Sequence, residues 1–323
     1  MDIQDTRIVV IGGAGLIGSH IVEELLREPV REITVFDNLT RGTRGNLATA
    51  LTDSRVRLYE GDIQHTDVLN AALEGADAVF HLAALWLLHC HEFPRAAFGV
   101  NIEGTFNVIE ACVRQRVKRL VYSSSASVYG DAVEVPMTEE HPYNNTTFYG
   151  AAKIAGEHMC RAFHHRYGLD YVGLRYMNVY GPRQDYRGTY TSVIMKMLDR
   201  LDRNQPPVIY GDGSQAYDFI YVADTARANV CALKSAATDQ CFNVGSGIRT
   251  SVGELCDLLL RVTGCDLQPE YLPAGPTFVT HRVGSTARAE RDLGFRATTA
   301  LEDGLRRLIA WRNQQPDTRG YPI

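Results

Sequence analysis

The sequence predicts an α/β fold, in which helices cover both faces of a doubly wound parallel sheet and a smaller α/β lobe follows. The first observation is that short continuous apolar runs alternate with amphipathic stretches in the first part of the chain. Strands that are buried on both faces need such Val-, Ile- and Leu-rich runs. The second observation is length, because 323 residues exceed what one compact core usually holds.

The expected strands of the large sheet are separated by segments long enough to form crossover helices. Two of these segments, 19–26 and 106–116, have the apolar spacing of an amphipathic helix. Neighbouring parallel strands need such crossovers, so the alternation predicts a parallel sheet. The apolar runs that we expect to form strands are 7–11, 32–36, 56–59, 78–82 and 119–123.

Beyond about residue 179, Gly- and Pro-rich turns punctuate the chain and predict the second lobe. Helices are expected there at 252–262 and 301–313. The stretch 218–233 again has the pattern of a strand followed by a helix, so the chain is expected to return to the first lobe. We predict a first domain of residues 1–178 plus about 217–245, and a second domain of residues 179–216 and 246–323.

Composition excludes several classes of partner. The net charge is only -5 and the basic residues are scattered, so neither nucleic acid nor a membrane surface is an expected partner. No apolar run reaches membrane-spanning length, and the first residues lack the pattern of a signal peptide. The seven cysteines are odd in number and widely spaced, which is typical of reduced core thiols. We therefore expect a cytoplasmic protein that acts on small molecules.

The segment Gly12-Gly-Ala-Gly-Leu-Ile-Gly18 directly follows the first expected strand and opens the first helix. Glycines permit a tight turn and let backbone amides approach a pyrophosphate at the helix N-terminus. Asp37 ends the second strand, where a carboxylate accepts hydrogen bonds from an adenosine ribose. This Rossmann-type arrangement favours NAD, because the carboxylate would repel the 2′-phosphate of NADP. Arg41 and Arg44 argue for NADP, since both lie close enough to reach such a phosphate.

Tyr149 and Lys153 lie four residues apart, so they share one face of a helix. A nearby ammonium would lower the pKa of the phenol and let it exchange a proton with a substrate hydroxyl. This spacing alone is common on any helix. Upstream, however, the run Ser123-Ser-Ser125 ends the fifth expected strand and places hydroxyls at the sheet edge where α/β folds bind ligands.

Together these residues resemble the extended short-chain dehydrogenase/reductases, and most closely their nucleotide-sugar epimerases of the UDP-glucose 4-epimerase type. The resemblance covers nearly the whole chain. That family usually forms homodimers through two helices per subunit, which would here be 94–114 and 149–167. The other matching segments are Asp37-Asn-Leu, Gly61-Asp-Ile, His81-Leu-Ala-Ala, Asn101 with Gly104-Thr, Leu174 to Arg183, Gly211-Asp-Gly and Asn243-Val-Gly.

The resemblance implies a role for each residue at a matching position. Tyr149 would be the acid and base, Lys153 would tune it and bind the nicotinamide ribose, and Ser125 would hydrogen-bond the reacting sugar oxygen. The nucleotide sugar would also contact Asn178, Val208, Tyr210 and Arg282. Besides Tyr149 and Lys153, NAD would be lined by Gly12, Gly15, Leu16, Ile17, Gly18, Asp37, Asn38, Asp62, Ile63, Ala83, Ala84, Asn101 and Tyr176.

The resemblance leaves more than one reaction open. Relatives that eliminate water or decarboxylate typically carry an acidic residue just after the catalytic hydroxyl, where this chain has Ala126 and Ser127. We therefore expect NAD-dependent epimerisation of a UDP-hexose, N-acetylhexosamine or uronic acid, most simply at C4 through a keto-sugar. A nucleotide-sugar dehydratase or reductase is the alternative. A non-catalytic NAD(P)-sensing protein is less expected, because such proteins commonly lose the tyrosine.

Two features depart from the family pattern. Tyr217 stands where an arginine usually meets the diphosphate, so Arg282 or Arg183 would have to supply that charge. The loop that carries Trp86 and His89 lacks the usual small hydroxyl residues, and these two side chains would either contact an unusual sugar group or pack. Its two histidines and cysteine do not predict a metal site, because adjacent ligands on a short segment seldom reach tetrahedral geometry.

Overall fold

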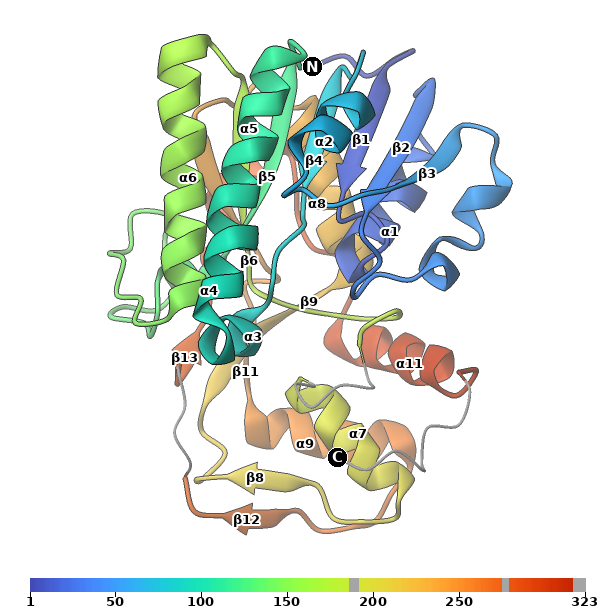
Figure 1. Cartoon of the computed structure of the whole chain (residues 1–323). Coiled ribbons are helices and arrows are strands. Elements are labelled where there is room, and N and C mark those ends of the chain that lie inside the picture. The colour runs from blue at the N-terminus through green and yellow to red at the C-terminus, as the bar shows by residue number, and fades with distance from the viewer. Residues whose placement is uncertain (186–191, 275–278, 316–323) are drawn as a thin grey trace.

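The structure is a computed structural model that describes residues 1–185, 192–274 and 279–315. Figure 1 shows a large sheet with helices on both faces, and a smaller lobe of short strands and helices below it. All neighbouring strands of the large sheet are parallel, which confirms the predicted doubly wound α/β fold. Their order is β10 (Gln240–Val244), β6 (Tyr171–Tyr176), β5 (Arg119–Ser125), β4 (Ala78–His81), β1 (Arg7–Ile11), β2 (Glu32–Asp37) and β3 (Val56–Glu60).

Alternate residues of the central strands enter two separate cores, one on each face of the sheet. Ile8 and Val10 of β1 pack with the first core, whereas Val9 and Ile11 pack with the second. This division explains why the strand reads as a continuous apolar run. Side chains for the first core come from α1 (Leu16–Leu25), α8 (Val222–Lys234) and α10 (Ala287–Leu293), and for the second from α2 (Thr66–Ala72), α5 (Thr105–Arg114) and α6 (Phe148–Tyr167).

The connection from β4 to α5 is itself helical. It consists of α3 (Leu87–Glu92), α4 (Pro94–Ala97) and a π-helical segment, Phe98–Gly104, that runs directly into α5. Single 3₁₀ turns occur at Arg44–Leu47, Ala50–Thr52 and Ala126–Val128. Within the described ranges, no helix has both the length and the apolar character needed to cross a membrane.

The smaller lobe is built on two short sheets and its own hydrophobic core. In one sheet β9 (Ala216–Tyr221) pairs with β7 (Asn178–Tyr180), β11 (Arg249–Ser251) and β13 (His281–Arg282), and in the other β8 (Val208–Tyr210) pairs with β12 (Glu270–Leu272). Buried residues from both lobe sheets and three helices form one cluster. The helices are α7 (Val193–Asp202), α9 (Val252–Thr263) and α11 (Leu301–Arg312).

The chain passes between the two lobes more than once. β9 pairs with strands of the smaller lobe, whereas α8, β10 and α10 pack with the large sheet. The division into residues 1–178 plus 217–245 and residues 179–216 plus 246–323 stays a prediction. Its second part includes residues 186–191, 275–278 and 316–323, which lie outside the described residues.

Candidate active site

The candidate site lies at the carboxyl edge of the central sheet, the edge where α/β folds bind their ligands. β1 ends there in the glycine turn 12–18, with β2 on one side and β4 on the other. β5 ends at the same edge in Ser125, and the first turns of α6 carry Tyr149 and Lys153. Because α6 packs against β5, the structure brings the glycine turn, the serine and the Tyr–Lys pair to one edge.

The glycine turn leaves no room for side chains at two of its positions. Gly12 has φ +79°, and a Cβ there would lie 2.7 Å from the backbone nitrogen of Ala83. A Cβ on Gly18 would collide with the carbonyl oxygen of Gly12. α1 begins directly after Gly15, which provides no side-chain cap, so the first amides of the helix are available to an anion. The turn therefore fits a pyrophosphate.

Asp37 closes the second strand and is held by the turn and by its own loop. Its Oδ2 accepts a hydrogen bond from the Ala14 N–H (2.9 Å), and its Oδ1 accepts one from the Leu39 N–H (2.9 Å). Burial raises the pKa of this carboxyl, and the two backbone hydrogen bonds oppose that rise. The carboxyl is thus fixed beside the turn, where a ribose would lie in a bound dinucleotide.

The two arginines that would favour NADP have other partners. Arg41 forms an ion pair with Asp185 (3.5 Å), and its guanidinium lies 3.8 Å from the ring centroid of Trp86. Arg44 forms an ion pair with Glu60 (3.2 Å). Because both cations have these partners, the geometry beside the end of β2 favours a ribose hydroxyl over a phosphate.

The remaining predicted cofactor residues surround the turn. Asn38 donates a hydrogen bond to Asp62 Oδ2 (2.8 Å). Asn101 accepts from the Leu85 N–H (2.7 Å) and donates to the Leu85 carbonyl (2.9 Å), so its amide holds the segment after β4. Tyr176 turns its phenol into the core, which leaves its main chain for any contact with a ligand. Partly or fully buried near the ends of β1, β3 and β4 are Leu16, Ile17, Ile63, Ala83 and Ala84.

Tyr149 and Lys153 share one face of α6, as their spacing predicts. Lys153 is buried, and its Nζ donates to the carbonyl of Ser123 (2.7 Å). The same Nζ lies 5.7 Å from the ring centroid of Tyr149. Tyr149 hydrogen-bonds with Ser125, whose Oγ also accepts from the Ser127 N–H (3.1 Å). A phenol, a hydroxyl and an ammonium therefore lie together.

The expectation that the ammonium lowers the pKa of the phenol to near neutrality is wrong for this structure. Desolvation raises the pKa of Tyr149 to about 12, although the hydrogen bond with Ser125 opposes the rise. Desolvation also lowers the pKa of Lys153 to about 8, while Cys90 and Glu157 raise it. Burial therefore outweighs the neighbouring charge within the protein alone, and a further positive charge beside the phenol would be needed to favour its ionised form.

The predicted substrate residues lie in two places. Asn178 begins β7, and its Nδ2 donates to a β9 carbonyl (3.2 Å). Tyr217 of β9 and Arg282 of β13 are paired in register. Val208 and Tyr210 lie on β8, at the end of the smaller lobe that is distant from the central sheet in Figure 1. The structure therefore does not bring β8 beside Tyr149 and Lys153, and a ligand touching both places would have to be long.

Arg282 lies near enough to Tyr149 for its charge to act on the phenol, as does Arg41. Its Nε is buried and has no hydrogen-bond partner among the described residues, and desolvation lowers the pKa of its guanidinium. Tyr217 donates its hydroxyl to the Val279 carbonyl (2.9 Å). Arg183, the other candidate, forms an ion pair with a glutamate of α1. Arg282 is thus the cation that is available to a diphosphate.

The segment after β4, expected to be a loop, contains the short helix α3. The ring of Trp86 lies against Arg41, and His89 packs between the Trp86 and Phe93 rings, with centroid distances of 5.0 and 5.1 Å. These contacts favour packing for His89. In the ranges that the structure describes, no three His, Cys, Asp or Glu side chains are placed to hold a metal ion.

Sequence reasoning assigned no role in the site to three residues that shape it. Asp131 accepts a hydrogen bond from the Thr280 N–H (2.9 Å) and so anchors the approach to β13. Cys90 is buried close to Lys153. Glu157 lies one helical turn after Lys153, and this spacing was a visible signal. Asp131 and Cys90 act through contacts between distant segments, which no local pattern reveals.

Comparisons with known proteins identify the family. Residues 8–245 match the model of the NAD dependent epimerase/dehydratase family. A UDP-glucose 4-epimerase of Mycolicibacterium smegmatis is 32% identical over 94% of this chain and 97% of its own, and a dTDP-glucose 4,6-dehydratase of an Actinoplanes species is 31% identical with the same coverage. The solved UDP-N-acetylglucosamine 4-epimerase of Methanobrevibacter ruminantium, in complex with UDP-N-acetylmuramic acid, is 33% identical, covers 97% of this chain and 100% of its own, and superposes with a TM-score of 0.91.

These matches span nearly the whole chain at identities above 30%, and the family description names the cofactor that the glycine turn and Asp37 predict. The predicted NAD and the resemblance to extended short-chain dehydrogenase/reductases are both confirmed. The chain belongs to the NAD-dependent epimerase/dehydratase family.

Proposed function

We propose that the protein is an NAD-dependent 4-epimerase of a UDP-linked hexose, N-acetylhexosamine or uronic acid. The observation that carries the proposal is the convergence of Ser125, Tyr149 and Lys153 beside the glycine turn, without an acidic residue directly after the serine. The relatives that act on UDP-sugars at C4 support it.

In this proposal each side chain has one task. Bound NAD supplies hydride exchange, so that the sugar is oxidised to a keto-sugar and reduced again from its other face. Ser125 holds the reacting sugar oxygen by a hydrogen bond. With the positive charge of bound NAD beside it to favour the phenolate, Tyr149 would take the proton of the sugar hydroxyl and later return it. Lys153 keeps a positive charge beside the phenol and contacts the nicotinamide ribose.

The smaller lobe would bind the nucleotide part of the substrate. Arg282 has a buried Nε without a partner among the described residues, which suits the charge of a diphosphate. Asn178 would contact the substrate near β7, and Val208 and Tyr210 would border the base. Tyr217 would support this nucleotide-binding region through the hydrogen bond that its hydroxyl donates to the Val279 carbonyl. Trp86, whose ring lies against Arg41, would border the sugar.

A dehydratase is the second candidate, because one relative has that activity. Elimination needs a further acid next to the reacting carbons, and Ala126 and Ser127 stand directly after the catalytic serine. Asp131 is the next carboxylate along the chain. It already accepts hydrogen bonds from both the N–H and the hydroxyl of Thr280, which hold it in a structural position. These observations favour epimerisation.

The test is to incubate the protein with UDP-glucose, UDP-N-acetylglucosamine and UDP-glucuronic acid and to identify products by NMR. Epimers without net NAD reduction support the proposal, whereas loss of water indicates a dehydratase. Tyr149→Phe should reduce turnover by about 10²-fold or more, because the proton-transferring hydroxyl is lost. NAD binding should stay close to wild type, as measured by fluorescence titration. Unchanged turnover in Tyr149→Phe would refute the proposed mechanism.

We also propose that the protein works as a homodimer that joins through α5 and α6. These helices lie side by side on the outer face of the second core, as Figure 1 shows. Phe106, Phe163 and Tyr167 form a chain of aromatic contacts on them, with centroid distances of 5.5 and 5.2 Å. We call these three residues the α5–α6 aromatic patch. Phe106 and Tyr167 are exposed in the single chain, which suits a surface that a partner subunit covers.

A further inference from the structure

One face of α6 contacts the end of β5 at three successive levels. Three of its residues follow one another at intervals of four, so they line a single face of the helix. Each of them reaches one of the last three residues of the strand. The contacts are Tyr149 with the Ser125 hydroxyl, Lys153 Nζ with the Ser123 carbonyl (2.7 Å), and Glu157 with the Ser124 hydroxyl, which donates to it.

We propose that Glu157, held by Arg175, is a positioning residue that fixes α6 at one height against the end of β5. The inference rests on the proposed function, because this height sets the phenol of Tyr149 beside the hydroxyl of Ser125. A displacement of about 1 Å in such a site can lower a rate by roughly 10²-fold. Glu157 itself acts only through other residues, namely the strand end and Lys153.

The carboxylate of Glu157 is held in one orientation. Arg175 Nε donates to Oε1 (2.9 Å), Arg175 Nη2 donates to Oε2 (2.7 Å), and the Tyr143 hydroxyl also donates to Oε2 (3.0 Å). Arg175 lies on β6 directly opposite Ser124 in the sheet register. The other hydrogen bonds of Arg175 are to the Tyr129 hydroxyl (2.8 Å), the Tyr143 hydroxyl (2.8 Å) and the Glu139 carbonyl (2.9 Å).

The ion pair of Glu157 and Arg175 fixes the orientation of its neighbours more than it adds to stability. Its side chains are only 5% and 6% exposed, and the desolvation of two buried charges largely offsets their attraction. An apolar pair of similar volume would serve stability equally well. A planar guanidinium that uses all of its N–H groups, however, allows a single arrangement of its partners. The pair therefore specifies where α6, β5 and β6 meet.

The charge of Glu157 also reaches the catalytic ammonium. Desolvation alone would raise the pKa of Glu157, but the hydrogen bonds and charge of Arg175 outweigh it and keep the pKa below its usual range. The ionised carboxylate raises the pKa of Lys153, which desolvation lowers to about 8. Without that negative charge, Lys153 would lose its proton at a lower pH.

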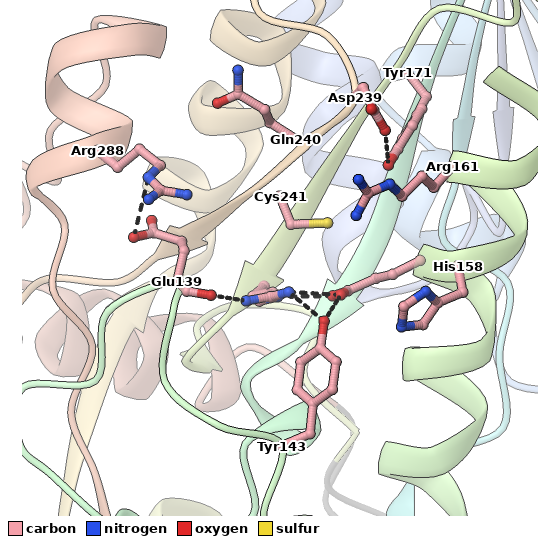
Figure 2. Close-up of a pocket in the computed structure, with 11 residues that line it drawn as sticks. Glu139, Tyr143, His158, Arg161, Tyr171, Asp239, Gln240, Cys241 and Arg288 are labelled. Atoms are coloured by element: carbon pink, nitrogen blue, oxygen red, sulfur yellow. Dashed lines mark hydrogen bonds and ion pairs between the residues drawn. The ribbon is translucent and has the colours of Figure 1, made fainter. Parts of the chain in front are cut away.

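The pair can be reached from solvent through a cavity. Glu157 and Arg175 help to line a space of about 190 Å³ at the outer edge of β6 and β10. Figure 2 shows His158 and Arg161 of α6 on one side of it and Glu139 with Arg288 on the other. His158 and Arg161 are exposed, so a small cation can enter. This access makes chemical rescue of an Arg175 variant possible.

The first experiment compares Glu157→Gln with wild type in a turnover assay on the UDP-sugar that wild type epimerises. Glutamine keeps the shape and removes the charge, so we expect kcat to fall by about tenfold to hundredfold while NAD affinity is retained. The alkaline limb of the kcat profile should move to lower pH, because Lys153 loses its proton earlier. The matched control is Asp170→Asn, which weakens the ion pair of buried Arg119 at the other end of β5 (3.1 Å). It should lower the melting temperature without moving the alkaline limb.

The second experiment uses the cavity. Arg175→Ala should lose activity, and millimolar methylguanidinium should restore part of it, at least fivefold over an equal concentration of sodium chloride. Arg175→Lys keeps a positive charge but lacks the planar guanidinium. Its activity should therefore lie between that of the alanine variant and that of wild type. Circular dichroism confirms that each variant is folded before its rates are compared.

Two outcomes overturn the inference: a Glu157→Gln variant with wild-type kcat and an unmoved alkaline limb, or one whose only change is a lower melting temperature. These outcomes leave the proposed function intact, because that function is decided by Tyr149→Phe and by product analysis. If Tyr149→Phe keeps full turnover, the function fails whatever Glu157 does.

Discussion

Arg282 stands in an unusual position for a charged side chain. It lies opposite Tyr217 in the register of β13 and β9, close to the Tyr149 phenol, and no described residue accepts from its Nε. A buried guanidinium N–H without a partner is unfavourable, so this partly buried cation gains from an anionic ligand. Tyr217 does not supply a charge, but its hydroxyl holds the Val279 carbonyl, three residues before Arg282. We therefore expect Arg282 to supply the charge that the family pattern would place at the position of Tyr217.

Replacing Arg282 with methionine tests this at the level of one side chain. Methionine keeps much of the stem and removes the charge, so KM for the UDP-sugar should rise by roughly tenfold to hundredfold, the range of a charge-assisted hydrogen bond. kcat should change less, and NAD affinity should not change. Steady-state kinetics with an isothermal titration of NAD give these values. The control is Arg249→Met, an arginine of β11 whose side chain is 50% exposed; equal KM values in the two variants would contradict the role of Arg282.

Local spacing predicted those residues whose geometry follows from neighbours in the chain. The glycine turn and the Tyr149–Lys153 pair are of this kind, because a turn and a helix fix them. The hydrogen bond of Tyr217 joins residues 62 positions apart, and no pattern announces it. The pKa of Tyr149 was beyond prediction for a related reason. The spacing of Tyr149 and Lys153 indicates that an ammonium lies near the phenol. It does not reveal the desolvation, which has the largest effect on the pKa of Tyr149.

At the scale of elements, Arg41 joins three segments that are separate in the sequence. It belongs to the loop after β2, stacks on Trp86 before α3, and forms an ion pair with Asp185 beyond β7. These segments all lie at the edge where the glycine turn and Asp37 would hold NAD. A bridge across that edge should slow the escape of a bound dinucleotide.

Arg41→Ala should therefore speed NAD dissociation by roughly fivefold to thirtyfold, because about 1–2 kcal/mol of cation–π and ion-pair energy is lost. Stopped-flow fluorescence measures this rate, since Trp86 lies at the bridge and Trp311 is the one other tryptophan of the chain. Arg44→Ala is the matched control, because Arg44 lies in the same loop but forms an exposed pair with Glu60. A dissociation rate that is equal in both variants would show that the bridge does not retain NAD.

The sequence predicted five of the seven strands of the central sheet within a residue or two, because burial on both faces leaves long apolar runs, but β6 and β10 were not predicted. The smaller lobe was harder. β13 has two residues and β7, β8, β11 and β12 have three each, too few to show a period. Their pairing also joins distant segments, as where β9 meets β7, β11 and β13. The helix α3 was not predicted, because its six residues are too few to show a helical period.

At the scale of the whole molecule, the α5–α6 aromatic patch is the feature that a single chain leaves unexplained. Phe106 and Tyr167 are 41% and 56% exposed although they belong to the helices that cover the second core. Exposing such apolar side chains to water is unfavourable, whereas burying them in a subunit interface is favourable. The patch is formed by both helices, so a two-fold axis near it would pair it with the same patch of a second copy.

Phe106→Glu should weaken that dimer by about 10²-fold, because a hydrophobic anchor is lost and a charge would be buried. Light scattering across a concentration series measures the mass, with wild type expected at twice the monomer mass of 35.9 kDa and the variant approaching the monomer. The control is Ile248→Glu, which changes an apolar residue next to β11 in the smaller lobe that is more exposed than Phe106 (63%), and it should leave the mass unchanged. A wild-type monomer at micromolar concentration would contradict the proposed dimer, and a dimer that Phe106→Glu does not weaken would place the interface elsewhere. Because Tyr149 and Glu157 lie on the same α6 that would carry the interface, loss of the dimer should also lower kcat, whereas an interface on the smaller lobe would leave kcat unchanged.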